Sequence, residues 1–485
     1  MKTNLKQLFS DSAAFSLALM GNKLVAFLLV PVYTTYLSVQ QYGYWDITTS
    51  VLLIVTYLSM MGTDVAMAFY YHDAATLNER RRYLSTAIVL GIVLSICYFL
   101  IVGIGGRWWL SFLYEGQATY PQILLYAMGV NLTTVVIQHL LAYARYSRRV
   151  WVFNSMTMMY VIGSSLASIY FLVVDKRGVE GIFLGQWLWQ LVIVVVLLIL
   201  FRSELTWRLQ WRYCKDLLFY GLPLLPTLMS FWVLNSLSRP LLTVMGTVGE
   251  AGILGTAVRF ASVVALVTGA FQLAWRPFSM SLKDEEHAPR LYSSVARLYL
   301  LITTCGILFL SFVIRPIMQA LTGDPAFVEG YPIVWMLSLG TVLNTFHAII
   351  GIGLFIRKRT RVLTPIFLCA SLLYLGGNLF LIPFWGFWAV GVMTVVTYFL
   401  IMVWVYARAQ KIYPIDFRIA SMLSFLMIYV GLLSFVTWIQ VEGWRDAWLY
   451  YGFVVLLYIS SIFVTRLFRL HSLAQMRKVV QTWMR

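Results

Sequence analysis

Long apolar segments with almost no charge recur along the whole chain, and they limit what it can fold into. A helix needs roughly 20 apolar residues to cross the hydrocarbon core of a bilayer. Of the 485 residues, 61% are hydrophobic and 11% are charged, whereas soluble domains average about 45–50% and about 25%. The sequence therefore predicts an all-α polytopic membrane protein and excludes a soluble enzyme, a disordered chain and a disulfide scaffold. We expect about fourteen transmembrane helices, over roughly 10–37, 44–70, 83–105, 121–144, 150–174, 181–201, 217–245, 253–276, 291–314, 331–356, 362–383, 386–407, 418–439 and 447–465.

The basic residues predict the orientation of these helices. The chain has 36 Lys and Arg against 19 Asp and Glu, a net charge of +17. The connections on the side of the two termini hold 27 of these basic residues, and those on the other side hold 5. Because Lys and Arg accumulate in cytoplasmic loops, both termini are expected in the cytoplasm. The tail over 466–485 has apolar residues at helical spacing among basic ones, which predicts an amphipathic helix on the inner leaflet.

Motifs for chemistry are missing from the sequence. It has no GxxxxGK[ST] phosphate-binding loop, no GxSxG and no HExxH, so none of these routes to catalysis is open. The four cysteines form no metal-binding or paired pattern, and the five histidines are scattered. We expect a carrier that is not an enzyme, with no metal and no cofactor other than a coupling ion, Na⁺ or H⁺.

An internal repeat at an offset of 209 residues predicts two lobes. The segment 30–46 aligns with 239–255, so that Pro31 matches Pro240 and Gly43 matches Gly252. The same offset maps the first two predicted helices onto the seventh and eighth. Carriers built from repeats usually bind their cargo between them and work by alternating access. We expect an N-terminal lobe over 1–215, a C-terminal lobe over 216–411 related by a pseudo-two-fold axis, and two further helices over 412–465.

Four basic residues lie inside predicted helices: Lys23, Arg239, Arg259 and Arg297. Ionisable groups in a bilayer are costly and usually face a cavity. Arg239 and Arg259 lie ten residues either side of Gly249, so neighbouring antiparallel helices would bring them to a similar depth. We expect these cations to bind an anionic cargo. The alternatives are pairing with lobe-stabilising carbonyl groups or with an acid for Arg239 and Arg259, and a side chain that reaches the interface for Arg297.

Other polar groups in the predicted helices complete the candidate site. Asp64 lies near the cytoplasmic end of the second helix, where it is a candidate for ion coupling or for a gating ion pair. Asn22, Asn235 and Gln272 share helices with the buried cations, and we expect them to line the same cavity. The alternative is that these amides hold helices together.

The lobe starts resemble a known family. The stretches GNKLVAFLLVPVYTTYLSVQQYGYWDI (21–47) and MGTDVAMAFYY (61–71) are similar to the opening of the polysaccharide transporters. The stretch 238–278 resembles the start of their second lobe. These proteins are oligosaccharide flippases of the superfamily that also contains lipid II flippases and multidrug exporters.

The resemblance implies a V-shaped pair of lobes around a cationic cavity in a bacterial inner membrane. The implied activity is translocation of an undecaprenyl-pyrophosphate-linked oligosaccharide to the outer face, for O-antigen, capsule or exopolysaccharide synthesis. A polysaccharide polymerase and a chain-length regulator are the implied protein partners. The main alternative is a cation-coupled multidrug antiporter of the same superfamily, although the buried charges are mainly basic and favour an anionic cargo. A membrane-embedded polymerase and a passive scaffold are further alternatives.

Overall fold

The structure, a computed structural model, describes residues 21–105, 114, 121–206, 210–443 and 447–467, and this part of the chain is helical without strands. Twelve of its helical segments are long and apolar enough to cross a membrane. The helix over 21–36 and the shorter apolar helix Leu449–Val464 bring the described segments to the fourteen expected positions. The predicted all-α polytopic fold is confirmed. The predicted tail over 466–485 lies, beyond its first two residues, outside the described residues.

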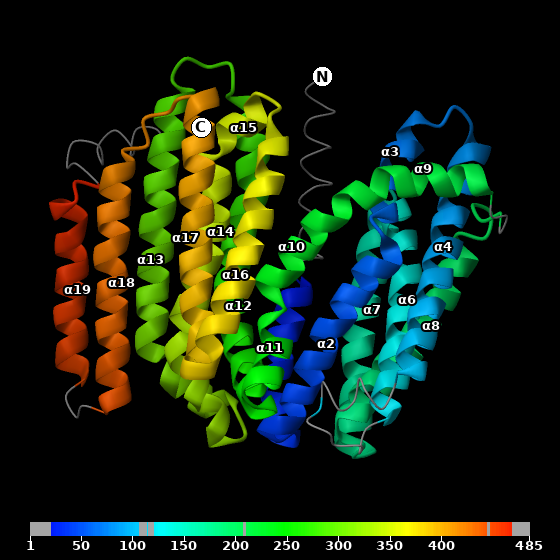
Figure 1. Cartoon of the computed structure of the whole chain (residues 1–485), viewed down its shortest axis with the longest axis horizontal. Coiled ribbons are helices and arrows are strands. Elements are labelled where there is room, and N and C mark those ends of the chain that lie inside the picture. Colours follow the sequence, from blue (N-terminus) through cyan, green and yellow to red (C-terminus); the bar gives the residue numbers. More distant parts are fainter. Residues whose placement is uncertain (1–20, 106–113, 115–120, 207–209, 444–446, 468–485) are drawn as a thin grey trace.

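The N-terminal lobe comprises the helix over 21–36 and six labelled α-helices, whose bounds follow. They are α2 (Val39–Met60), α3 (Thr63–Asp73), α4 (Leu77–Ile104), α6 (Pro121–Tyr146), α7 (Val150–Ile169) and α8 (Gly178–Leu200). Helix α9 (Trp211–Gly221) packs on α3 and α4 and lies across one end of this lobe (Figure 1). It leads into the C-terminal lobe, so the chain leaves the N-terminal lobe within its seventh spanning segment.

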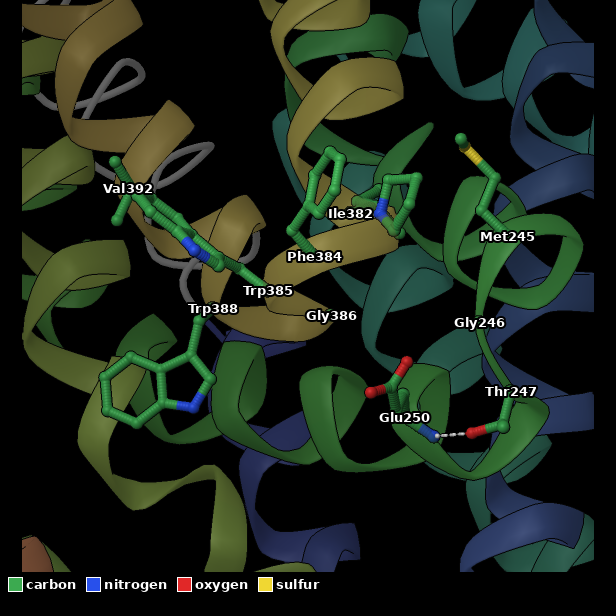
Figure 2. A pocket seen from close by; sticks show the side chains of 11 residues that line it. Met245, Gly246, Thr247, Glu250, Ile382, Phe384, Trp385, Gly386, Trp388 and Val392 are labelled. Atoms are coloured by element: carbon green, nitrogen blue, oxygen red, sulfur yellow. Dashed lines mark hydrogen bonds between the residues drawn. The ribbon is translucent and has the colours of Figure 1, made fainter.

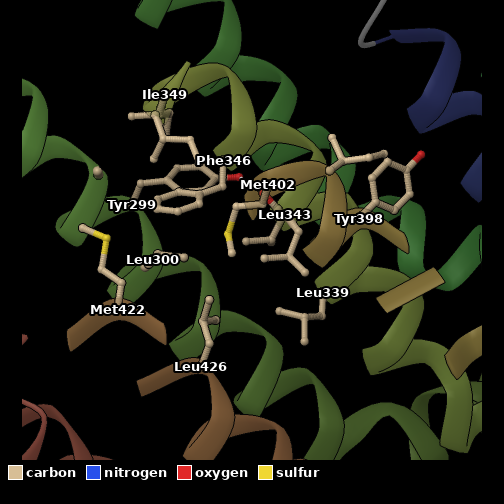
Figure 3. Packing of buried hydrophobic residues seen from close by; sticks show 14 of the residues in the cluster. Tyr299, Leu300, Leu339, Leu343, Phe346, Ile349, Tyr398, Met402, Met422 and Leu426 are labelled. Atoms are coloured by element: carbon tan, nitrogen blue, oxygen red, sulfur yellow. Dashed lines mark hydrogen bonds between the residues drawn. The ribbon is translucent and has the colours of Figure 1, made fainter. Parts of the chain in front are cut away.

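The C-terminal lobe begins with α10. It contains α10 (Leu225–Asn235), α11 (Ser238–Met245), α12 (Val248–Ser281), α13 (Ala288–Leu321), α14 (Val334–Ile350), α15 (Ile352–Ile356), α16 (Leu363–Trp385) and α17 (Phe387–Ile412). Helices α18 (Ile419–Glu442) and α19 (Ala447–Val464) flank it, with α18 packed on α13 (Figure 1). Interdigitating apolar side chains such as Phe346, Leu343 and Met402 fill the centre of this lobe (Figure 3).

The two ends of the bundle differ in charge. We call the end with the basic segments 80–82, 145–149 and 357–361 the basic end, and the end where α2 and α12 begin the far end. The two lobes meet at the far end and stand apart at the basic end, at the bottom and top of Figure 1. The V shape implied by the sequence resemblance is therefore present.

The contact between the lobes at the far end follows the repeat. A Cβ on Gly43 of α2 would overlap the carbonyl oxygen of Val248, and a Cβ on Gly252 of α12 would overlap that of Val39. Both pairs join residues that the offset of 209 exchanges, as in a two-fold symmetric interface. Matching caps begin the two helices: Ser38 accepts a hydrogen bond from the backbone N–H of Gln41, and Thr247 accepts one from Glu250. The pseudo-two-fold axis therefore passes between α2 and α12.

Two helices are broken at the same level, near the basic end. Met61 and Gly62 take the left-handed conformation between α2 and α3, with φ of 43° and 70°. The short 3₁₀ segment Leu222–Leu224 separates α9 from α10. Gly221 lies against the first break, because a Cβ on Gly62 would approach the Gly221 carbonyl oxygen to 2.8 Å. The break inside the N-terminal lobe thus touches the joint that leads to the C-terminal lobe.

Candidate functional site: an ion cluster between the lobes

Three ionisable side chains from both lobes meet close to the pseudo-two-fold axis. Asp46 of α2 is only 2% exposed. Its Oδ2 lies 2.5 Å from Nε of Arg239 on α11, and its Oδ1 lies 3.7 Å from Nη2 of Arg259 on α12. Neither Asp46 Oδ2 nor Arg239 Nε makes an aligned hydrogen bond, so this close contact is an ion pair. With two cations and one anion, the cluster carries a net charge of +1.

The repeat explains why the acid fits at this point. The position equivalent to Asp46 in the second lobe is Gly255, and a Cβ there would approach the Asp46 carboxylate to 2.6 Å. Two side chains on the axis would compete for one space, and the glycine leaves that space to the carboxylate. An unpaired charge in a dry environment is costly, so the nearby arginines make this buried carboxylate tolerable.

Neighbouring groups hold the two arginines in place. Arg239 Nη1 donates to the carbonyl oxygen of Asn235 at 2.9 Å, and the Asn235 side-chain oxygen accepts from the Tyr398 hydroxyl at 3.5 Å. The Arg259 guanidinium lies over the indole of Trp45, 4.7 Å from the ring centroid. Such a cation–π contact stabilises a partly desolvated arginine. The cluster is therefore anchored by both lobes.

Asp46 was not among the site residues expected from the sequence. It is the third residue of the predicted segment 44–70, where an acid at the membrane boundary is ordinary. The helix begins at Val39 instead, because Ser38 and Gln41 form a capping box that starts it earlier. The earlier start moves Asp46 about two turns into the helix. The capping pattern was the signal that would have placed Asp46 inside the helix, although not its partners.

The structure brings together only part of the predicted cationic site. Arg239 and Arg259 reach a similar depth, as expected, and both are paired with an acid, which was the alternative interpretation. Lys23 is exposed on the first helix, and no ion pair joins it to a described residue. At about 1.5 Å per helical residue, Lys23 lies roughly 10 Å further from the far end than Asp46 does. Lys23 therefore lies apart from the ion cluster, and its part in cargo binding stays a prediction.

Most of the remaining predicted residues also lie apart from the cluster. Arg297 is buried inside the C-terminal lobe, where it donates to the Ser293 carbonyl oxygen at 3.3 Å and to Ser294 Oγ at 3.2 Å. Gln272 Nε2 donates to Thr345 Oγ1 at 2.9 Å and so joins α12 to α14. Asn22 is half-buried, next to Lys23. Only Asn235, of the three predicted amides, contacts the ion cluster.

Asp64 lies in a different place, in the first turn of α3 directly after the break in α2. It is half-buried. His139 of α6, which is fully buried, binds the neighbouring Thr63 and is within the electrostatic influence of Asp64. Among the described residues, no group of three or more His, Cys, Asp or Glu is arranged to hold a metal ion.

A recess of about 770 Å³ opens at the far end of the C-terminal lobe. Figure 2 shows Phe384, Trp385 and Trp388 around it, with the Glu250 carboxylate on the opposite wall. Trp385 and Phe384 are exposed, as in the aromatic belts of membrane proteins. The recess contains none of the predicted cations and is separate from the ion cluster.

A second acid lies at the basic end, beyond the end of α8. Glu204 accepts from Arg81 Nε at 3.2 Å and from Arg149 Nη2 at 2.9 Å. Burial raises the pKa of this carboxyl, but the hydrogen bonds from Arg81 and Arg149 outweigh it, and the pKa lies below the ordinary value of 4.5. Glu204 thus ties the connections of the N-terminal lobe together.

Comparison with known proteins finds relatives in sequence and in fold. The chain is 24% identical over 283 residues to protein 1 of the Lsg locus of Haemophilus influenzae, a match that spans 56% of this chain and 66% of that relative, just under two thirds of its length. Its fold is similar to that of the lipid II flippase MurJ in an inward closed conformation. The TM-score is 0.70 and the identity 13%, over 96% of this chain and 99% of that one.

Two multidrug transporters also share the fold. An inward-facing MATE family transporter of the MOP superfamily gives a TM-score of 0.57 at 12% identity, over 84% of this chain and 94% of that one. The MATE transporter DinF-BH gives 0.56 at 16% identity, over 84% and 96%. The polysaccharide biosynthesis protein family matches residues 32–325, which is more than half of the chain. The expected resemblance is thus confirmed, and the chain belongs to the polysaccharide biosynthesis protein family.

Proposed function

We propose that the protein is a flippase that moves an undecaprenyl-pyrophosphate-linked oligosaccharide across a bacterial inner membrane for surface polysaccharide synthesis. The basic end would face the cytoplasm, with both termini on that side. Membership of the polysaccharide biosynthesis family and the similarity to a lipid II flippase support this proposal. The excess of basic residues at the basic end supports the orientation.

The observation that carries the mechanism is the ion cluster between the lobes. Asp46 belongs to one lobe, and Arg239 and Arg259 belong to the other. The cluster joins the lobes at the far end, whereas the lobes stand apart at the basic end (Figure 1). Alternating access requires the lobes to separate at the far end, and this movement would pull Asp46 away from both arginines.

The cargo offers a replacement for Asp46. A pyrophosphate carries more negative charge than a carboxylate. The planar guanidinium group of arginine binds phosphate oxygens through two parallel hydrogen bonds. A pyrophosphate that reaches Arg239 and Arg259 would compensate their charge while Asp46 is released. Cargo binding would then favour the opening of the far end, where a polymerase and a chain-length regulator use the glycan. The lipid chain would stay in the bilayer, between the separated edges of the lobes.

The test is transport by the purified protein. Liposomes that contain the protein and a fluorescent undecaprenyl-pyrophosphate oligosaccharide are treated with an impermeant quencher, which reports the lipid that has changed leaflets. We expect flipping by the wild type, and a large loss for Arg239→Ala and Arg259→Ala with normal membrane insertion. The Lys23→Ala variant tests whether this exposed cation also takes part.

Three outcomes would contradict the proposal. They are wild-type rates in all three variants, equal flipping of a lipid-linked sugar without the pyrophosphate, and no flipping by the wild type. Efflux of cationic dyes from the same liposomes, with no glycan flipping, would favour the multidrug antiporter instead.

A further inference from the structure

The break between α2 and α3 contains a polar cluster that the ion cluster between the lobes does not use. Thr63 is the first residue of α3, and its Oγ1 lies 2.6 Å from the carbonyl oxygen of Met60. This carbonyl ends α2 and is among those that a helix terminus leaves without a helical partner. The same Oγ1 lies 2.8 Å from Nε2 of His139 on α6. His139 and Thr63 are both buried.

One additional proton would complete the hydrogen bonds of this cluster. His139 Nδ1 lies 2.8 Å from the carbonyl oxygen of Val135, which only accepts, so Nδ1 carries a hydrogen. Thr63 has a single hydroxyl hydrogen. If the Thr63 hydroxyl hydrogen points to the Met60 carbonyl, the lone pair of a neutral Nε2 faces a lone pair of Oγ1. If this hydrogen points to Nε2 instead, the Met60 carbonyl has no donor. With a second hydrogen on the imidazole, Nε2 donates to Thr63 Oγ1, and Oγ1 donates to the Met60 carbonyl, so every group has a partner.

An acid lies close enough to act on the positive charge that this hydrogen brings. Asp64, on α3, is the acid that acts on His139 electrostatically, and an ionisable group in a membrane is expected to have such a partner. Gly91 of α4 packs against the ring at Cε1 and brings no charge of its own.

The other elements packed on α6 bring polar but uncharged groups to its neighbouring positions. On α8, Gln190 binds Thr133; on α7, Tyr160 binds Thr134; and on α2, Tyr57 lies near Asp64. Asp64 is therefore the counter-ion for a charged imidazole.

The position of the cluster connects it to lobe movement. Thr63 follows Gly62, whose backbone lies against Gly221 at the joint between α9 and α10. Helix α9 packs on the N-terminal lobe, whereas α10 packs on α16 of the C-terminal lobe. Because glycines leave no side chain between the two backbones, a change in the break is transmitted to the joint. Broken helices of this kind form the ion sites of many transporters.

We propose that His139 is a proton-binding site, with Asp64 as its counter-ion, and that proton binding there controls the joint between the lobes. The inference rests on the proposed transport function, and it names the proton as the coupling ion. In the conformation described here, the site lies near the basic end, so its proton would exchange with the cytoplasm. Loss of the proton would deprive either Met60 or His139 of a partner, and the break between α2 and α3 would rearrange.

The first experiment measures lobe movement without any cargo. Spin labels are attached at Asn78→Cys on the N-terminal lobe and Thr360→Cys on the C-terminal lobe, both exposed at the basic end, in a background without the four native cysteines. Distances are recorded in lipid nanodiscs between pH 5.5 and pH 8.5. A single linked proton changes the ratio of two conformations by up to about tenfold per pH unit. We expect this response in the wild type and not in His139→Gln.

Two further variants protect the test against misfolding. Thr63→Val removes the hydroxyl and should abolish the pH response, whereas Thr63→Ser keeps the hydroxyl and should retain it. His347→Gln is the matched control, because His347 is a half-buried histidine of the other lobe, and this variant should respond as the wild type does. A wild type without a pH response, or a His139→Gln variant with the wild-type response, would overturn the inference.

The second experiment separates this inference from the proposed function. Liposomes that flip the lipid-linked oligosaccharide are given a proton gradient. The wild type should accelerate, and His139→Gln should flip at its gradient-free rate. Equal acceleration of both proteins would overturn the proton site and leave the flippase intact. No flipping by the wild type, together with pH-dependent lobe distances, would overturn the flippase and support the proton site.

Discussion

Replacing Asp46 with Asn should release the lobes from each other at the far end. The substitution keeps the size of the side chain and removes the charge that compensates Arg239 at 2.5 Å and Arg259 at 3.7 Å. Both members of the closer pair are buried, because the side chain of Asp46 is 3% exposed and that of Arg239 is 10% exposed. The two arginines would then share a buried net charge of +2 in place of +1.

The magnitude follows from the burial of the pair. Removing one partner of a buried ion pair costs about 3–5 kcal/mol, since an uncompensated charge is left behind. The cost falls only on conformations in which the lobes meet at the far end, because separation lets both arginines reach water or an anion. At about 1.4 kcal/mol per factor of ten, the population ratio should shift between about 100-fold and a few thousandfold toward far-end opening.

Crosslinking across the far end measures this shift. A Cβ on Gly249 would lie 4.0 Å from Cγ1 of Val39 in the opposite lobe, which is close enough for a disulfide. The pair Val39→Cys and Gly249→Cys, without the native cysteines, should crosslink readily with Asp46 in place. The yield and rate should drop with Asp46→Asn.

Lys23→Ala provides the control, because this residue makes no ion pair with a described residue and should not alter crosslinking. An unchanged rate in Asp46→Asn would refute the idea that the ion cluster holds the lobes together. A similar drop in Lys23→Ala would show that the loss of any membrane cation has the same effect, and would refute it as well.

Three other predictions concern packing and charge. Gly43→Ala should weaken the contact between the lobes at the far end by about 1–3 kcal/mol, because its Cβ would overlap the Val248 backbone. Crosslinking across the far end should then be slower. Gly306→Ala is the control and should not slow crosslinking, because open space surrounds its Cβ. Glu204→Gln should lower the melting temperature at pH 7. Since the folded-state pKa of Glu204 is depressed, the wild-type advantage is present above pH 4.5 and lost as pH falls through the folded pKa, so melting curves of both proteins should converge in acid. Gln272→Met should lower stability but not abolish flipping, because Gln272 joins α12 to α14 away from the ion cluster; abolished flipping with normal stability would contradict this.

Local patterns predicted most of the architecture. The apolar segments placed the spanning helices, although several helices extend five to seven residues past the predicted bounds. Helix α2 begins five residues early, where Ser38 and Gln41 form a capping box, and α12 likewise begins at Val248 and not at 253. Helix α13 ends at Leu321 and not at 314. The offset of 209 predicted the pseudo-two-fold relation, and the reciprocal contacts of Gly43 and Gly252 are its consequence. Matched glycines in a repeat identify the point where two backbones touch.

The candidate site was predicted less completely. The similar depth of Arg239 and Arg259 follows from their equal separation from Gly249, because the chain reverses direction near that residue, between α11 and α12. Their partner does not follow from any local pattern, since Asp46 belongs to the other lobe. Lys23 was expected at the same site, but it lies at a different level along the bundle, roughly 10 Å from Asp46 by helical rise.

The sequence by itself determined that this chain is a two-lobed bundle of spanning helices. Apolar length, caps and a repeat are visible in the order of the residues, without knowledge of which segments meet in space. Only the tertiary structure decided which ionisable groups meet. That choice depends on how the lobes dock about the pseudo-two-fold axis, where Gly255 leaves room for the Asp46 carboxylate. It also depends on the contact of two broken helices at Gly62 and Gly221. In a membrane, where an unpaired charge is costly, these docking contacts determine which groups are free to bind a cargo or a proton.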